Sequence, residues 1–400
     1  MKARIAIVTT KQPSTNPRMR KNADALSAAG HNVLVLYAFG ANWADKPDEA
    51  LFRNTIWTHQ RIGGHPVHAP FQYFLSRVKR KWARWRNDID NQFCPSIEAY
   101  IEALSSFQPQ LVIGHNPGAL PILSRVQDGL KVKVLFDAED FHRGEFPQGS
   151  KEIELATQIE DQHVSKLTFL TAASPLTQEN YQKLYPNIKC VTINNTFDLR
   201  LQPEFKTLTS ETLKLCWFSQ VVGLDRGLQE FLSHLAHARE LELVITIVGN
   251  ATDEVKSILS QVVTHPSHQL QFLPATSETE LSNILSQHHI GLALEPGFSA
   301  NNLIARSNKI FFYPLCGCLT LLSKTPGQLD FHREYPETGE IIDLDDPKST
   351  VRILHLLAAN HFNLDTKREA AWKLGHDTLN WETESKKLVS FVNQILQDAP

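Results

Sequence analysis

Short apolar runs alternate along the chain with longer segments that carry apolar residues on one helical face. The first two runs, 3–9 and 33–37, are almost continuously apolar, which is typical of strands buried on both faces of a sheet. Between them, Asn16 and Pro17 predict a helix start, with asparagine as N-cap and proline at the first helical position, and Gly30 predicts its end. This connection is long enough to join two parallel strands.

The same alternation runs through two series, separated by the polar segment 198–212, which we interpret as a linker. It predicts two successive doubly wound, Rossmann-like α/β domains, 1–200 and 212–377, followed by a last helix over 378–397. The further strands expected are 111–114, 132–136, 167–171, 190–193, 213–218, 243–248, 270–273, 290–294 and 319–322. The helices expected in the second series are 227–237, 253–263, 278–287 and 308–316. The last helix has an apolar stripe of Trp381, Leu388, Phe391 and Ile395.

Polar residues follow the predicted strands of the first series, among them Thr10, His115, Asn116 and Asp137. In a parallel sheet these positions meet at the carboxyl edge, where ligands bind. Two such domains in tandem suit an enzyme that holds a nucleotide-linked donor on one side of a cleft and an acceptor on the other. No Gly-x-Gly-x-x-Gly follows a predicted strand, and the chain has no Walker A sequence and no Gly-x-Ser-x-Gly, so dinucleotide binding has little support.

The composition is that of a packed globular protein, with 42% hydrophobic residues and a net charge of −3 over 400 residues. This charge gives no general attraction to nucleic acid. No apolar run approaches the ~18 residues of a membrane span, and the run 5–8 is too short for a signal peptide, so we expect a cytoplasmic protein. The five cysteines are scattered, and we expect buried thiols, with Cys316 and Cys318 packed in a core rather than bound to a metal.

Several segments stand out when they are taken in order along the chain. They are Thr15–Arg18 with the Ala-Leu-Ser-Ala-Ala-Gly-His that ends at His31, Gly114–Pro117, Phe136–Asp140, Trp217–Gly227, Val248–Asn250, Ser307–Gly317, and the helix after Trp381. In this order they resemble the glycosyltransferase family 4-like proteins. The resemblance implies a GT-B fold with an interdomain cleft and a C-terminal helix that crosses back onto the N-terminal domain. It also implies a nucleoside-diphosphate-sugar donor, retention of anomeric configuration, and no metal or other cofactor.

The resemblance assigns catalytic roles to two residues. His115 would hydrogen-bond the donor sugar, the alternative being a histidine placed on a loop by chance. Arg226 would stabilise the leaving diphosphate, the alternative being a solvated charge. Gln220 aligns with the first of two cations that many relatives carry in this loop. The remaining candidates are Gly223, Gly249, Asn250, Glu295, Ser307, Asn308 and Lys309 for donor binding, and Asn16, Arg18, Asn116, Asp137, Glu139 and Asp140 on the acceptor side.

The stretch 307–309 has two interpretations: a helix N-terminus that holds phosphate oxygens, with Lys309 as a second cation, or an ordinary helix cap. The family's two glutamates, eight positions apart, are missing here. Phe312 occupies the second position, Ile304 lies eight positions before it, and Glu295 is near but not at that spacing. Pro314 also falls inside the predicted helix, where it should produce a kink.

An acidic stretch, Asp343-Leu-Asp345, resembles the Asp-x-Asp metal site of other glycosyltransferases. Asp346 and Pro347 begin a helix, however, and acidic residues are favourable at a helix start. We therefore interpret the acidic cluster as cap and first-turn charge and expect no metal site.

The segment 71–86 places six apolar residues on one helical face and basic residues over most of the rest, with no acidic residue. Such a helix can lie in an anionic membrane interface. Alternatively, the apolar stripe packs on the N-terminal domain and the charges are solvated. The apolar residues are Phe71, Phe74, Leu75, Val78, Trp82 and Trp85, and the basic ones are Arg77, Lys79, Arg80, Lys81, Arg84 and Arg86.

The sequence therefore predicts a GT-B glycosyltransferase of polysaccharide biosynthesis, cytoplasmic or peripheral on the inner face of a membrane. It would move a sugar from a nucleoside diphosphate to a glycan or a lipid-linked acceptor. The alternatives are a catalytically degenerate protein of this fold that binds a glycan or partner, and a sugar-nucleotide epimerase or hydrolase.

Overall fold

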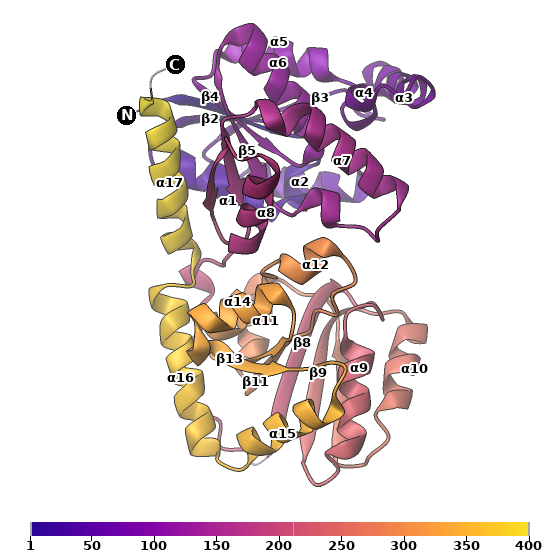
Figure 1. The fold of residues 1–400 in the computed structure, drawn as a ribbon, viewed down its shortest axis with the longest axis vertical. Coiled ribbons are helices and arrows are strands. Elements are labelled where there is room, and N and C mark those ends of the chain that lie inside the picture. Colours follow the sequence, from indigo (N-terminus) through magenta and orange to yellow (C-terminus); the bar gives the residue numbers. More distant parts are fainter. Residues whose placement is uncertain (1, 211, 399–400) are drawn as a thin grey trace. The chain divides into compact units, whose positions relative to one another are not determined.

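The structure of the protein is a computed structural model that describes residues 2–210 and 212–398. The chain forms two compact α/β units (Figure 1). The first takes in the described residues up to Asn194 together with 299–301 and 385–398, and the second takes in the rest. The division falls at Asn194–Asn195, so the expected linker 198–212 groups with the second unit. Within this segment the Phe205 ring packs against that of Trp372 at 6.1 Å, and just before it the Phe197 ring stacks on that of Phe312 at 4.1 Å.

The first unit is built on a seven-stranded sheet in which every paired neighbour is parallel, in the order β3-β2-β1-β4-β5-β6-β7. Most of these strands are buried along their length, as continuous apolar runs predict. The strands are β1 (Arg4–Thr9), β2 (Asn32–Ala38), β3 (Thr58–Ile62), β4 (Leu111–His115), β5 (Lys133–Ala138), β6 (Phe169–Ala172) and β7 (Lys189–Thr192).

Among the described residues, four of the eight helices named below for the first unit begin at a side-chain N-cap, which is Asn16, Asp88, Ser150 or Ser174. The side chain of Asn16 accepts a hydrogen bond from the backbone N–H of Met19, and Gly30 has a positive φ after the helix end, so the predicted start and end of this helix are confirmed. The helices are α1 (Pro17–Ala28), α2 (Asp45–Phe52), α3 (Pro70–Trp85), α4 (Ile89–Phe93), α5 (Ile97–Phe107), α6 (Leu120–Leu130), α7 (Lys151–His163) and α8 (Pro175–Leu184).

The second unit has a six-stranded parallel sheet in the order β10-β9-β8-β11-β12-β13. Its strands are β8 (Leu213–Val221), β9 (Leu243–Asn250), β10 (His268–Leu273), β11 (Ile290–Ala293), β12 (Leu319–Ser323) and β13 (Gly339–Ile342). Its helices are α9 (Leu228–His234), α10 (Asp253–Val262), α11 (Glu278–Leu285), α12 (Ala300–Ile304, shared with the first unit), α13 (Lys309–Leu315), α14 (Pro326–Glu334), α15 (Pro347–Ala358) and α16 (His361–Asp377).

Two strands, β3 and β13, were not expected from the sequence. Both lie at an edge of their sheet. In β3 the sequence Thr-His-Gln-Arg-Ile has one aliphatic residue, and three of its five residues are exposed. An edge strand needs no continuous apolar run because one flank faces no neighbour, so its sequence carries a weak signal.

The last helix, α17 (Trp381–Gln397), groups with the first unit from Ser385 onward. Its apolar stripe is buried at Leu388, Phe391 and Ile395. The Phe391 ring meets that of Phe169 edge to face, and Lys133 Nζ donates to the Ile395 carbonyl at 2.8 Å. This helix therefore covers the first unit.

All five cysteines are free and buried. Burial raises the pKa of the Cys318 thiol to about 12, and its Sγ donates to the carbonyl of Leu285 at 3.1 Å. Both members of the Cys-Gly-Cys pair lie in the apolar core of the second unit, as expected for packing residues. No helix among the described residues is long and apolar enough to cross a membrane.

Candidate functional site

A row of polar residues crosses the carboxyl edge of the first sheet. In the strand register, Thr9 pairs with His115, His115 with Asp137, and Asp137 with Thr171. Neighbours in register on parallel strands project to the same face of the sheet. Four adjacent strands thus bring polar side chains together, and all four of these residues are fully buried.

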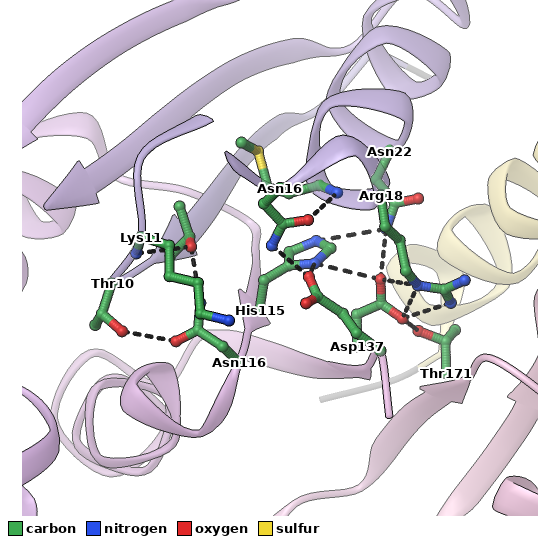
Figure 2. A network of polar contacts seen from close by, with 12 residues as sticks. Thr10, Lys11, Asn16, Arg18, Asn22, His115, Asn116, Asp137 and Thr171 are labelled. Carbon is green, nitrogen blue, oxygen red and sulfur yellow. Dashed lines mark hydrogen bonds and ion pairs between the residues drawn. The ribbon is translucent and has the colours of Figure 1, made fainter. Parts of the chain in front are cut away.

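Asp137 is the centre of this cluster (Figure 2). Arg18, from the first turn of α1, donates from Nε and Nη2 to the carboxylate, with the shortest distance 2.7 Å. Asn22 Nδ2 donates at 2.8 Å, and so does Thr171 Oγ1. Since Arg18 and Asn22 are four positions apart, both lie on the same face of α1. Asn22 and Thr171 belong to the cluster although the sequence analysis did not select them.

Both carboxylates of the cluster are held ionised by their partners. Burial alone would raise the pKa of Asp137, but the charges of Arg18 and His115 outweigh it and lower the pKa. Burial also acts to raise the pKa of Glu139, and the hydrogen bond from His115 lowers it below the ordinary value. The cluster is therefore a set of fixed charges at neutral pH.

His115 is completely buried, and its ring nitrogens face other members of the cluster. Nδ1 lies 2.9 Å from Glu139 Oε1, and Nε2 lies 3.4 Å from Asn22 Nδ2. Because a carboxylate only accepts, Nδ1 carries the proton. In this conformation the imidazole donates its Nδ1 hydrogen bond to Glu139 and so orients that carboxylate.

Glu139 connects the buried cluster to solvent, since its side chain is 15% exposed. Asn16 caps α1 with its Oδ1 and donates from Nδ2 to Glu139. The carboxylate is thus fixed by two side chains while part of it faces solvent. Such a group can accept a hydrogen bond from a sugar hydroxyl or take up its proton.

Two further candidates lie beside the cluster. Asn116 has a φ of 60°, and its side chain links Thr9 and Thr10 with hydrogen bonds of 2.8 and 2.6 Å. The side chain of Asp140 accepts from Asn301 Nδ2 within the same unit, and burial raises its pKa to about 6.

In the second unit, the candidate loop after β8 begins later than expected because the strand continues to Val221 across a bulge. Gln220 is exposed at this strand end. The Arg226 side chain is 43% exposed and 3.9 Å from Asp225, a weak pairing. Gly223 lies in the same loop, and Gly227 takes a φ of 74° at the start of α9.

Gly249 is required by a close approach of two strands. A Cβ there would lie 2.4 Å from the carbonyl oxygen of Ser219, and its φ is 156°. Asn250 follows at the exposed end of β9. Glycine is therefore needed at position 249 because a side chain would collide with the neighbouring strand, a reason that the sequence alone did not supply.

Glu295 and Lys309 come together at the ends of β11 and the start of α13. Lys309 Nζ lies 3.7 Å from the Glu295 carboxylate and 5.4 Å from the Trp217 ring centre. Asn302 Nδ2 donates to the same carboxylate at 2.6 Å. Phe312, at the position of the missing glutamate, is fully buried. Glu295 is therefore the carboxylate that this chain places beside α13.

Three buried oxygens of the second unit, in the segments that follow β11 and β12, have no hydrogen-bond partner among the described residues. They are Ser307 Oγ, Thr325 Oγ1 and Gln328 Oε1. Gln328 is tied to this edge because its Nε2 donates to the Ala293 carbonyl. Buried polar atoms without partners are rare in folded proteins, so these oxygens are suited to accept from a ligand. Thr325 and Gln328 follow β12, a strand end that the sequence analysis did not use.

The expected cap of α13 does not form. Neither Ser307 nor Asn308 caps it with a side-chain hydrogen bond, and the helix has only seven residues. Pro314 lies in its last turn, and the helix ends one residue later at Leu315. The predicted kink is therefore a helix end.

The acidic stretch before α15 has the expected helix-start contacts. Asp346 accepts from the backbone N–H of Lys348, and Asp343 accepts from that of Asp345. Lys324 Nζ lies 3.3 Å from Asp343. Within residues 2–210 and 212–398, no group of three or more His, Cys, Asp or Glu side chains is arranged to hold a metal ion.

No family model matches the sequence, and no curated protein matches it. Solved structures match over the whole chain. Sucrose-phosphate synthase from Thermosynechococcus elongatus has a TM-score of 0.74 at 12% identity, covering 98% of this chain and 99% of its own. A glycosyltransferase from Rickettsia africae has a TM-score of 0.71 at 12% identity, covering 100% of both chains. HepE from Anabaena, solved with UDP and glucose, has a TM-score of 0.68 at 12% identity, covering 98% and 100%.

At these identities the likeness establishes the fold. The two parallel-sheet units are those of a GT-B glycosyltransferase fold, and the predicted fold class is confirmed.

Proposed function

We propose that the protein is a glycosyltransferase that moves a sugar from a nucleoside diphosphate to a glycan or lipid-linked acceptor. The observation that carries the proposal is the match of the whole fold to transferases, one of them described with UDP and glucose bound. Fold alone does not fix an activity, so the polar residues at the two sheet edges are the second support.

The donor diphosphate would bind at the carboxyl edge of the second sheet. Arg226 is a half-exposed cation with only a weak partner, and it would balance the charge that develops on the leaving phosphate. Glu295, held by Lys309 and Asn302, would accept from donor hydroxyls. The unpartnered oxygens of Ser307, Thr325 and Gln328 would accept further hydrogen bonds from the donor.

The cluster around Asp137 in the first unit would bind and orient sugar hydroxyls through Glu139. His115 then acts as a positioning residue because its ring holds that carboxylate at 2.9 Å. Among the residues that the structure describes, no carboxylate is an evident nucleophile, so we infer retention by front-face substitution, assisted by the leaving phosphate and independent of a metal. The family 4-like resemblance supports the same chemistry.

A thermal-shift screen over nucleoside diphosphates and their sugars tests this proposal. We expect one nucleotide series to raise the unfolding temperature and the matching sugar nucleotide to be consumed with transfer to an added acceptor. Consumption without transfer would indicate an epimerase or hydrolase. No shift with any nucleotide would indicate a degenerate protein of this fold and overturn the proposal.

We also propose that α3 attaches the protein to anionic membranes. The alternative was that the apolar stripe packs on the N-terminal domain, but the stripe is exposed. Each of the six apolar side chains of the stripe is between 48% and 80% exposed, and Ala83, which faces the opposite way on the helix, is buried. Figure 1 shows α3 at the edge of the first unit, beside α4.

Charge identifies the occupant of this surface. Basic residues flank the exposed apolar face on both sides, with Lys79 and Arg86 on one and Lys81 and Arg84 on the other. No acidic side chain lies on the helix. A basic, aromatic-rich face of this kind fits the interface of an anionic bilayer, where each cation contributes about 1 kcal/mol.

Co-sedimentation with vesicles tests the attachment. Binding is expected to vesicles with 30% phosphatidylglycerol, to fall with salt, and to be much weaker with phosphatidylcholine alone. Lys79→Glu with Lys81→Glu should weaken binding by roughly 30-fold or more, at about 1 kcal/mol for each lost cation. The control, Lys46→Glu with Lys166→Glu, changes exposed lysines elsewhere in the same unit. Equal loss in both double variants, or binding indifferent to lipid charge, would contradict the proposal.

A further inference from the structure

A second feature of α3 lies on its inner side. A cavity of about 150 Å³ is enclosed between this helix, the segment 93–96 and the carboxyl ends of β1, β2 and β3. Arg77 and Arg80 of α3 line it, and they are the only charged residues among the described residues of its wall. A cavity of this size admits a single small group rather than a whole glycan.

The two guanidinium groups have no carboxylate partner among the described residues. Arg80 is half-buried, and its Nε is buried without a hydrogen-bond partner. Burial, and then the positive charge of Arg77, lower the pKa of Arg80. Arg80 is a half-buried charge with a like charge beside it and an Nε–H that has no acceptor, and this costs free energy that a bound anion would recover.

The rest of the wall supplies neutral hydrogen-bonding groups and close backbone. Ser76, Ser96 and Tyr73 line the cavity. Gly63 takes a φ of 81°, and a Cβ there would lie 2.6 Å from Ser96 Oγ. A side chain at position 63 would therefore fill the space that the cavity leaves open.

The cavity also adjoins the polar cluster of the first unit. Thr10 lines it, and Thr10 Oγ1 donates to Asn116 Oδ1 at 2.6 Å. Asn116 follows His115 directly. The cavity and Glu139 therefore lie at the same carboxyl edge of the first sheet, the cavity at the ends of β1, β2 and β3 and Glu139 after β5.

We propose that this cavity binds the phosphate group of a phosphate-bearing acceptor, with Arg77 and Arg80 as its ligands. One guanidinium group can donate two parallel hydrogen bonds to two oxygens of a phosphate. Two guanidinium charges balance a phosphate dianion better than they balance a singly charged carboxylate ligand. The assignment of the ligand as acceptor rests on the proposed function. The phosphate can belong to a lipid headgroup or to a soluble sugar phosphate, and both present the same oxygens.

Calorimetric titration of the whole protein at constant ionic strength tests the site. The probes are inorganic phosphate and dihexanoyl phosphatidic acid below its micelle concentration, with dihexanoyl phosphatidylcholine as a probe without a free phosphate monoester. We expect both phosphate probes to bind. Arg80→Met and, separately, the exposed Arg77→Met should each weaken binding by about 10- to 100-fold. Arg53→Met, an exposed arginine of the same unit that lies outside the cavity, should leave the affinity within about twofold.

Equal affinity for the two phosphate probes would show that the site recognises the phosphate group alone. Tenfold tighter binding of the lipid would show that it recognises a lipid headgroup. Binding of inorganic phosphate that neither Arg77→Met nor Arg80→Met weakens, or no binding to the unaltered protein at 10 mM, overturns the site. The readout needs no transfer activity. A protein that binds phosphate through Arg80 but responds to no nucleoside diphosphate therefore keeps the site and loses the proposed function.

Discussion

Replacing Arg18 with methionine should expose how strongly the Asp137 cluster depends on one buried ion pair. The substitution keeps the length of the side chain and removes the guanidinium. Asp137 then keeps only the hydrogen bonds from Asn22 and Thr171, and the Ile193 carbonyl loses its 2.7 Å partner. Removing one partner of a buried pair typically costs 3–5 kcal/mol, so we expect Arg18→Met to lower the free energy of unfolding by about 3–5 kcal/mol at neutral pH.

The loss should depend on pH with a definite sign. In the unaltered protein the pKa of Asp137 is depressed, so its contribution to stability is present above the unfolded pKa of about 3.9 and is lost as pH falls through the folded pKa. Without Arg18, burial loses its strongest opposing influence while His115 and Thr171 still act to lower the pKa of Asp137, so we expect this pKa to rise. The variant is then penalised most at high pH, and the difference between the two proteins shrinks as pH falls from 7.5 to 5.

Urea unfolding followed by circular dichroism at pH 7.5 and pH 5 measures both quantities. If the units unfold in separate steps, only the transition of the first unit should shift. The companion variant Arg18→Met with Asp137→Asn removes the unpaired charge and should recover part of the loss. A cost below about 1 kcal/mol at pH 7.5, or one that is unchanged at pH 5, would refute the account of Asp137 as a charge held by Arg18.

Three further outcomes are expected. Arg226→Ala should lower the rate of transfer by a factor of about 10²–10³ with little change in stability, and Arg226→Lys should restore part of the rate. Normal activity in Arg226→Ala together with loss of activity in Lys309→Ala would assign the leaving-group cation to Lys309. Transfer should keep its full rate in EDTA, and a loss restored by Mg²⁺ or Mn²⁺ would contradict metal independence. Gly249→Ala should destabilise the protein by more than about 1 kcal/mol because its Cβ would meet the Ser219 carbonyl, whereas Asn250→Ala, at an exposed position, should not.

Much of the fold is legible in the sequence because its strands are buried on both faces. Continuous apolar runs located all the central strands, and Asn16 with Pro17 located the start of α1 to the residue. The signal fails at two edge strands: β3 has one aliphatic residue and three exposed ones, and β13 has only four residues, Gly-Glu-Ile-Ile. The end of β8 was also placed too early, since its last residues, Gln220 and Val221, are exposed.

The candidate site was legible only in part. Strand ends identify His115 and Asp137 because the carboxyl edge collects whatever follows each strand. They cannot tell which side chains meet. Asn22 lies in the middle of a helix, and only its spacing from Arg18 indicates that it joins the cluster. The contact of Glu295 with Lys309 joins a strand end to a helix start, and no periodicity predicts such a pairing.

The two sheet edges differ in how completely their buried polar groups are satisfied, and this difference bears on their roles. In the first unit, Asp137 receives hydrogen bonds from three side chains, and Glu139 receives them from Asn16 and His115. These two carboxylates are fixed before any ligand arrives, which suits a group that must orient a substrate hydroxyl, although Asn22 Oδ1 in the same cluster has no hydrogen-bond partner among the described residues. In the second unit, Ser307, Thr325 and Gln328 each keep a buried oxygen without a partner. We expect those oxygens to gain most when a ligand supplies the missing donors. Under the proposed function, binding energy would then be concentrated at the edge assigned to the donor, and positioning at the edge that carries Glu139.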